Sequence, residues 1–469
     1  MPQKNKLISN SLAMLVNRLT QGIATFILTA TIARTLGAEV LGQYLLAMNY
    51  YFIFVNLFSQ GFKTLFTREL SLNPEIAPIY LVSGTLLQLL FGLIGYIAMS
   101  TTIFILPYSD TTSAICYLVG AMIIPFALSN ITEAIFQAQE KMYLIAFSTV
   151  PIYILRLLAI IWFLHLQYGL EYVVITLIIS ESLILIVQWL LLLNIVKPKW
   201  QIDRNFIWKA VKESKTFFAL EGMGIIASRI DILTLSLLGS EAIVGIYGAI
   251  CQLLQPYDIV SSSLALAAFP SMSKAVAEGK TKQRQVAENV IEILLCISLP
   301  FLVGIYFIGD RLLLFIYQNP SFTDRAVILH IISLSLITAA FSRPFNFLLI
   351  ANGLEKLNLI EVAITTIVGG FTGIVLISQF KLMGAALMSL SISFTNFSVM
   401  MFFVHNRLFH IQLLKIMFRP LLISFLMVIV FLVMYQINLD FLSTVVLATL
   451  FYIGFTTLLV VRKPGGIYL

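Results

Sequence analysis

The sequence has 469 residues, of which 59% are hydrophobic and only 11% charged, and its mean hydropathy is +0.97. A soluble globular domain carries about 25% charged residues, so this composition excludes a water-soluble enzyme and indicates a membrane protein. The formal net charge of +7 does not indicate nucleic-acid binding, because the basic residues are scattered through short segments.

Apolar stretches long enough to cross a bilayer recur along the whole chain. A hydrocarbon core about 30 Å thick needs about 20 helical residues per crossing. We therefore predict an all-α polytopic membrane protein of about 14 transmembrane helices. The first stretch lacks a small-residue cleavage site, so we expect it to be retained. The expected helices span 8–33, 41–62, 79–106, 113–136, 143–165, 171–196, 212–238, 243–270, 287–308, 325–350, 357–379, 383–404, 418–436 and 441–461.

The lysines and arginines indicate the orientation of these helices. If the N-terminus is cytoplasmic, most of the 29 basic residues lie in cytoplasmic segments, as the positive-inside rule expects. An even number of crossings then places the C-terminus on the same side. The exceptions are Arg34, Arg311, Arg325 and Lys381 in outer segments, and Arg18, Arg156, Arg229 and Arg343 within helices.

The first predicted helix carries a polar stripe. At about 100° per residue, Asn17, Arg18 and Gln21 share an arc of about 120° with other polar residues, and leucines and isoleucines occupy the opposite side. An arginine exposed to hydrocarbon is costly, so we expect this stripe to line a hydrated cavity; polar contact between helices is the alternative. Arg156 and Glu181 lie at similar depths on neighbouring helices, and we predict that they form a structural ion pair; contact with the substrate is the alternative.

The longest predicted cytoplasmic connection is basic and contains Trp200 and Trp208. Tryptophan favours the headgroup level of a membrane, so we interpret this connection as a linker on the membrane surface. With this linker, the chain has four predicted parts. These are a six-helix lobe at 1–196, the linker at 197–211, a second six-helix lobe at 212–406 and two additional helices at 407–469.

The second lobe also carries charged residues within its helices. Glu221, Arg229 and Asp231 lie on one predicted helix, and Asp258 and Arg343 lie on two others. The three carboxylates are candidates for binding a coupling ion, such as a proton or Na⁺; satisfied structural carboxylates are the alternative.

The two lobes show an internal repeat. LGAEVLGQY at 36–44 resembles LGSEAIVGIY at 238–247, and AQEKMYLIAFS near Glu140 resembles NGLEKLNLIEVAI near Glu355. Each pair lies at equivalent places in the two halves. Since six helices separate the copies, the halves face the same way and form a parallel repeat.

The sequence contains no motif that indicates an enzyme. It lacks the phosphate-binding loop G-x-x-x-x-G-K-[ST] and the zinc motif H-E-x-x-H. The three cysteines have no metal-ligand spacing, and no predicted outer loop is long enough for a catalytic domain. We therefore expect a secondary transporter with no cofactor and no bound metal.

Five segments resemble one known family. They are ARTLGAEVLGQY, FTREL, ASRIDILTLSLLGSEAIVGIYGA, GDRLLLFIYQNPSFTDRA and FKLMGAALMSLSIS. In order and placement they are similar to the polysaccharide-transport branch of the multidrug/oligosaccharidyl-lipid/polysaccharide exporter superfamily. This branch contains the O-antigen and exopolysaccharide-unit flippases, with lipid II flippases as relatives.

The resemblance implies two six-helix lobes in a V shape that work by alternating access. It implies that an oligosaccharide linked to a polyprenyl diphosphate moves from the cytoplasmic to the outer leaflet of the cell inner membrane. Arg18 matches by position the cationic side chains that this family places in its lumen, and Arg229 and Arg343 are the candidate partners of Arg18 in binding the anionic substrate. The implied partners are the lipid-linked oligosaccharide, membrane lipids and glycan polymerase machinery. A cation-coupled multidrug exporter of the same superfamily is the alternative function.

Overall fold

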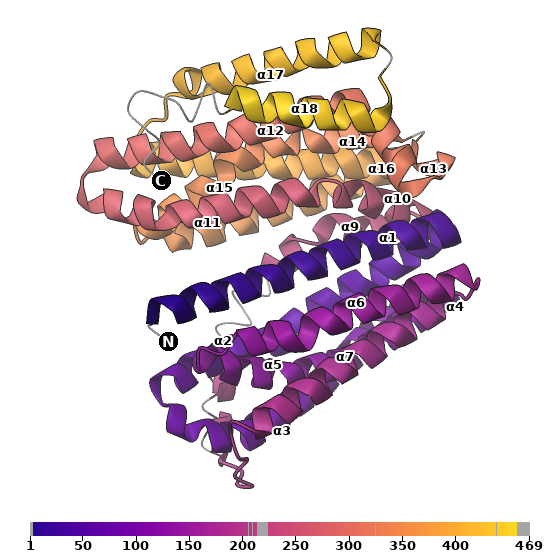
Figure 1. The fold of residues 1–469 in the computed structure, drawn as a ribbon, viewed down its shortest axis with the longest axis vertical. Coiled ribbons are helices and arrows are strands. Elements are labelled where there is room, and N and C mark those ends of the chain that lie inside the picture. The colour runs from indigo at the N-terminus through magenta and orange to yellow at the C-terminus, as the bar shows by residue number, and fades with distance from the viewer. Residues whose placement is uncertain are drawn as a thin grey trace. The chain divides into compact units, whose positions relative to one another are not determined.

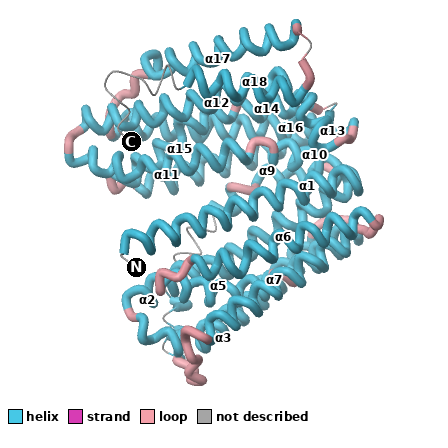
Figure 2. The backbone as a smooth tube through the Cα atoms, viewed as in Figure 1, coloured by secondary structure: helices cyan, strands magenta, loops and turns pink. Residues whose placement is uncertain are grey.

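The computed structural model describes residues 3–204, 206–208, 210–212, 224–323, 325–437 and 439–456. Over these ranges the backbone is helix and loop, with no strand (Figure 2). A helix satisfies its backbone hydrogen bonds within its own segment, which is what a chain in hydrocarbon requires. The sequence prediction of an all-α polytopic membrane protein is therefore confirmed.

The elements follow one another with short connections. The helices of the first half of the chain are α1 (Gln3–Val55), the π-helix η1 (Asn56–Gln60), α2 (Gly61–Leu72), the 3-10 turn η2 (Pro74–Ile76), α3 (Ala77–Ile105), α4 (Asp110–Gly120), α5 (Ile123–Ala138), α6 (Tyr143–His165) and α7 (Leu170–Leu193). Those that follow are α9 (Ile230–Leu238), α10 (Glu241–Gln252), α11 (Gln255–Ala277), α12 (Lys280–Tyr317), α13 (Pro320–Thr323), α14 (Ala326–Ser333), α15 (Ser335–Ala351), α16 (Glu355–Arg407), α17 (Leu413–Gln436) and α18 (Phe441–Thr456).

Within the described residues, ten helical stretches are long and apolar enough to cross a membrane. Two elements, α1 and α16, have 53 residues each, or about 80 Å of helix, far more than one crossing needs. Each is divided by a residue with positive φ. In α1 this is Gly37, with φ 85°, a conformation that glycine adopts without a Cβ penalty. In α16 it is Lys381, with φ 48°.

The chain packs into two compact units, residues 1–246 and 247–469. In the first unit, α6 lies beside the N-terminal arm of α1 and beside α7 (Figure 1). The core of the first unit includes Phe62, Phe66, Leu81 and Phe136, each at most 1% exposed. These side chains come from α2, α3 and α5, so the core fixes the ends of those helices against one another.

In the second unit, α12 is the central element and contacts α11, α14, α15 and α17. Ala265, Leu294, Phe345 and Leu348 are completely buried where α11, α12 and α15 meet. The last two helices, α17 and α18, pack beside α12 (Figure 1). Thus the additional helices rest on one face of the second unit.

Several helix boundaries differ from the sequence prediction. Residues 287–308 were expected for the helix that the structure extends to Lys280–Tyr317, because its polar ends continue the helix beyond the apolar stretch that hydropathy detects. The predicted helix at 212–238 is interrupted by a turn at Ser228 and Arg229. There the Arg229 N–H donates to the carbonyl of Ile226, 3.1 Å away, in place of the usual i−4 bond.

Candidate functional site

An open hollow of about 390 Å³, called the polar hollow here, lies in the second unit. It is bounded by α11, by α14 and α15, and by the later arm of α16, with Cys251 and Leu254 at the α10–α11 junction. Apolar membrane helices seldom enclose so many polar groups, which makes this hollow the leading candidate site. Its polar lining residues are Asp258, Ser335, Ser342, Arg343, Ser389, Ser393 and Asn396.

Asp258 and Arg343 form an ion pair at this hollow. Arg343 Nη2 donates to Asp258 Oδ1, and Arg343 Nη1 lies 3.5 Å from the Asp258 carbonyl oxygen. The guanidinium carbon is also 5.5 Å from the centre of the Tyr257 ring. The sequence assigned Arg343 to substrate and Asp258 to a coupling ion. The structure places the two opposite charges together, so a ligand that binds either group competes with the other.

Hydroxyl groups link α15 to α16 along the same hollow. The hydroxyls of Thr338 and Ser393 are hydrogen-bonded, and Ser393 also reaches the carbonyl of Ser335 at 3.4 Å. These bonds are within one unit and hold the polar wall together. Such groups can also exchange hydrogen bonds with a sugar hydroxyl.

Glu361, on the earlier arm of α16, lies behind the hollow. It is 2% exposed, and its Oε1 accepts from Asn396 Nδ2 at 2.7 Å and from the Thr365 hydroxyl at 3.1 Å. Asn396 itself lines the hollow. The sequence analysis did not include Glu361 in the site. The sequence pattern that could have indicated it is a glutamate and a threonine four residues apart, which share one helical face.

The polar stripe of α1 divides into two parts. Asn17 is 9% exposed, and its Oδ1 accepts from the Thr149 hydroxyl on α6 at 2.7 Å. Arg18 and Gln21 are exposed within their unit. In the described part of the chain Arg18 makes no ion pair. Asn17 therefore joins two helices, whereas Arg18 and Gln21 remain open to a ligand.

The other predicted site residues lie in the first unit. Arg156 Nη1 is 3.1 Å from Glu181 Oε1, and both side chains are about nine-tenths buried between α6 and α7. The Arg229 guanidinium carbon lies 4.4 Å from the centre of the Phe52 ring. Asp231 Oδ1 accepts from the N–H of Ile232 at 2.8 Å. Glu221 lies outside the described residues.

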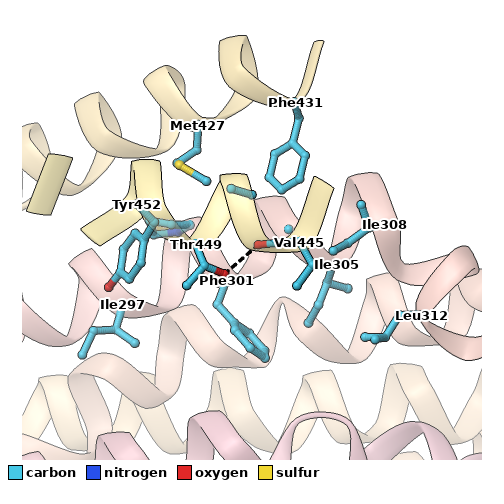
Figure 3. A pocket seen from close by; sticks show the side chains of 13 residues that line it. Ile297, Phe301, Ile305, Ile308, Leu312, Met427, Phe431, Val445, Thr449 and Tyr452 are labelled. Carbon is cyan, nitrogen blue, oxygen red and sulfur yellow. Dashed lines mark hydrogen bonds between the residues drawn. The ribbon is translucent and has the colours of Figure 1, made fainter. Parts of the chain in front are cut away.

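A second hollow, of about 290 Å³, lies where α12 meets α17 and α18. Figure 3 shows Phe301 and Ile305 of α12 facing Met427 and Phe431 of α17 and Tyr452 of α18 across it. The Thr449 hydroxyl donates to the Val445 carbonyl at 2.8 Å within α18. Because the Thr449 hydroxyl is already hydrogen-bonded within its helix and most of the other lining side chains are apolar, this hollow suits a hydrocarbon chain and does not suit a sugar.

The fold is that of a polytopic membrane protein, and solved membrane transporters share it. The structure reported as "Lipid II flippase MurJ, inward closed conformation" matches with a TM-score of 0.77 and 18% identity over 96% of this chain and 98% of that one. An inward-facing multidrug resistance MATE family transporter of the MOP superfamily matches at 0.66 and 14%, over 84% and 95%. A MOP superfamily transporter from Pyrococcus furiosus matches at 0.59 and 13%, over 85% and 93%.

The sequence comparison identifies the family. A sequence model described as polysaccharide biosynthesis protein matches residues 7–276, more than half of the chain. The chain therefore belongs to the polysaccharide biosynthesis protein family. Among curated proteins, no sequence matches it significantly.

Proposed function

We propose that the protein is a flippase that moves a polyprenyl-diphosphate-linked oligosaccharide from the cytoplasmic to the outer leaflet of the cell inner membrane. The observation that carries this proposal is the open polar hollow with Arg343, lined by the helices of a membrane protein of the polysaccharide biosynthesis family. A diphosphate in hydrocarbon is very costly, so the headgroup needs a polar route.

The residues supply both kinds of contact that such a substrate needs. Arginine binds phosphate through charge-assisted and often bidentate hydrogen bonds. Arg18 is exposed, and the Arg343 side chain is 25% exposed at the polar hollow. The serine hydroxyls and Asn396 of the hollow suit sugar hydroxyls. A polyprenyl chain remains in lipid or in an apolar hollow such as that between α12, α17 and α18.

Other features complete the proposal. Alternating access involves the predicted lobes at 1–196 and 212–406, with the linker at 197–211 and the additional helices at 407–469. Both termini lie in the cytoplasm, and a proton or Na⁺ gradient drives the cycle through Asp231, Asp258 or Glu221. The substrate is an O-antigen or exopolysaccharide unit, which a glycan polymerase uses after transport.

Reconstitution in liposomes tests the function directly. A lipid-linked oligosaccharide is placed in both leaflets, and its outer-leaflet pool is removed by an added glycosidase in the presence and absence of an ion gradient. We expect the protected pool to become accessible only in vesicles that contain the protein. A pool that stays protected under every gradient would contradict the proposal.

A cation-coupled multidrug exporter is the second candidate. Its support is the fold likeness to a MATE family transporter and the Asp258 side chain, which is 51% exposed at the hollow and carries a negative charge. The same vesicles distinguish the two functions, because an exporter accumulates a cationic fluorescent drug and leaves the lipid-linked sugar in place.

A further inference from the structure

The basic linker is held firmly on the first unit. After α7 ends at Leu193, the N–H of Lys199 donates to the Pro78 carbonyl at 3.2 Å. The N–H of Asp203 donates to the Ser83 hydroxyl at 3.0 Å. Both acceptors belong to the first turns of α3. The linker therefore runs along the ends of α3 and α7, two helices long enough to cross a membrane.

The later part of the linker is helical at 204, 206–208 and 210–212, and it has two different faces. Phe206 is 7% exposed, with its ring 3.9 Å from the centre of the Tyr80 ring, and Ala210 is 2% exposed. Arg204, Trp208 and Lys212 follow one another at intervals of four residues and are all exposed. Residues four apart share a helical face, so two cations flank a tryptophan on the outward face.

Charge and aromatic content continue through the whole linker. Residues 197–212 contain Lys197, Lys199, Arg204, Lys209 and Lys212 against a single acid, Asp203. The carboxylate of Asp203 already accepts from the N–H of Phe206 at 3.1 Å and caps the helix. Trp200 is 88% exposed and Trp208 is 74% exposed. The outward surface is therefore cationic and aromatic, on a backbone that is fixed to the protein.

We propose that the exposed side chains of Lys197, Lys199, Trp200, Arg204, Trp208 and Lys212 form a docking surface for the headgroups of anionic phospholipids in the leaflet that the linker faces. Tryptophan rings favour the headgroup level of a bilayer, and lysines and arginines near the surface are attracted to anionic lipids. The occupant is the phospholipid surface itself. The substrate of the transporter is not required, so the inference stands apart from the proposed function.

Brominated lipids test this surface on the full-length chain. The protein has four tryptophans, and Trp162→Phe with Trp189→Phe leaves only Trp200 and Trp208 to fluoresce. This protein is reconstituted into two kinds of vesicle that contain both zwitterionic phosphatidylcholine and anionic phosphatidylglycerol. In one kind the phosphatidylcholine carries bromine in the upper acyl chain, and in the other the phosphatidylglycerol does. At equal mole fractions, we expect the brominated anionic lipid to quench about twofold more strongly.

Two charge variants complete the test. Arg204→Gln with Lys212→Gln removes the cations that flank Trp208, and we expect the preference for the brominated anionic lipid to decrease. Lys280→Gln with Lys282→Gln removes the same charge from an exposed segment of the second unit and should leave the preference intact. Equal quenching by the two lipids in the starting protein would overturn the proposal, as would loss of the preference in the control variant.

Native mass spectrometry provides a readout on the chain with its natural tryptophans. Protein purified from mixed-lipid vesicles should retain phosphatidylglycerol in preference to phosphatidylcholine, and the Arg204→Gln and Lys212→Gln pair should reduce that retention. Retention that is the same in this variant and in the unaltered chain contradicts the proposal even if the tryptophan replacements prevent folding. Transport of a lipid-linked sugar is measured separately, so failure of one idea does not decide the other.

Discussion

Gly42 lies directly against the backbone of Glu241. A Cβ on Gly42 would lie 1.7 Å from the Glu241 carbonyl oxygen, and a Cβ on Gly245 would lie 1.9 Å from the carbonyl oxygen of Ala38. Gly42 and Gly245 occupy equivalent positions near the ends of the two copies of the repeated motif, at 36–44 and 238–247. The two copies therefore pack on each other reciprocally, through positions where only glycine leaves room.

Gly42→Ala should destabilise this contact. The added methyl group overlaps a backbone atom, so the helices must separate, which costs about 1–3 kcal/mol. Thermal unfolding of the purified protein in detergent measures the loss. Gly245→Ala should act in the same way, and the double variant should cost less than the sum because both changes open one contact.

A matched control for this prediction is Gly454→Ala in α18. A Cβ at Gly454 meets nothing within 4 Å, and alanine favours helix over glycine. We expect unchanged or slightly higher stability there. If Gly42→Ala is as stable as Gly454→Ala, the reciprocal contact does not exist in solution.

Arg343→Gln should have little effect on folding and a large effect on transport. The Arg343 and Asp258 side chains are 25% and 51% exposed, and ion pairs as open as this contribute about 0–1 kcal/mol to stability. If Arg343 binds the diphosphate, transport of the lipid-linked sugar in proteoliposomes should fall by at least about tenfold, the equivalent of one charge-assisted hydrogen bond. The double variant Arg343→Gln and Asp258→Asn tests whether Arg343 binds the diphosphate or only neutralises the charge of Asp258. Recovery of transport in it would show that Arg343 only neutralises Asp258.

Arg18→Ala and Asn17→Ala should have opposite effects. Arg18 is exposed, so its removal should leave the protein folded in the membrane and abolish assembly of the surface glycan. Asn17→Ala removes the bond to the Thr149 hydroxyl and should lower the free energy of unfolding by about 1 kcal/mol. It should retain transport per folded molecule. Normal glycan output from Arg18→Ala would remove Arg18 from the substrate route.

The sequence predicted well those features that depend on local pattern. Apolar length gave the membrane helices, and the similar depth of Arg156 and Glu181 on two helices joined by a short turn indicated their proximity before any packing was known. Gly37 stands at the predicted turn between two crossings because the apolar stretches stop there. Each of these inferences uses residues that are close in sequence or adjacent along a hairpin.

Features that depend on distant packing could not be predicted. Asp258 and Arg343 are 85 residues apart, and only the packing of α11 on α15 brings them together. Glu361 and Asn396 are 35 residues apart and meet only because α16 folds back at Lys381. Asn17 and Arg18 fall in one polar arc at about 100° to each other, and that arc cannot show which residue faces the neighbouring helix.

Glu181→Ala should destabilise the protein strongly. Glu181 and Arg156 are about nine-tenths buried, and removing one partner leaves an uncompensated charge, which costs about 3–5 kcal/mol. The Arg156 guanidinium lies 4.7 Å from the centre of the Tyr153 ring, but a ring does not replace a carboxylate. Thermal unfolding in detergent should therefore show a large loss.

Replacing both partners with methionine should recover most of the stability. Arg156→Met with Glu181→Met removes both charges and keeps similar volume, and such replacements are often neutral or stabilising. If the pair is structural, the double variant should also transport the lipid-linked sugar at the normal rate per folded molecule. A double variant that is stable but does not transport would instead place the pair on the substrate route, because stability alone would then fail to explain the need for its charges.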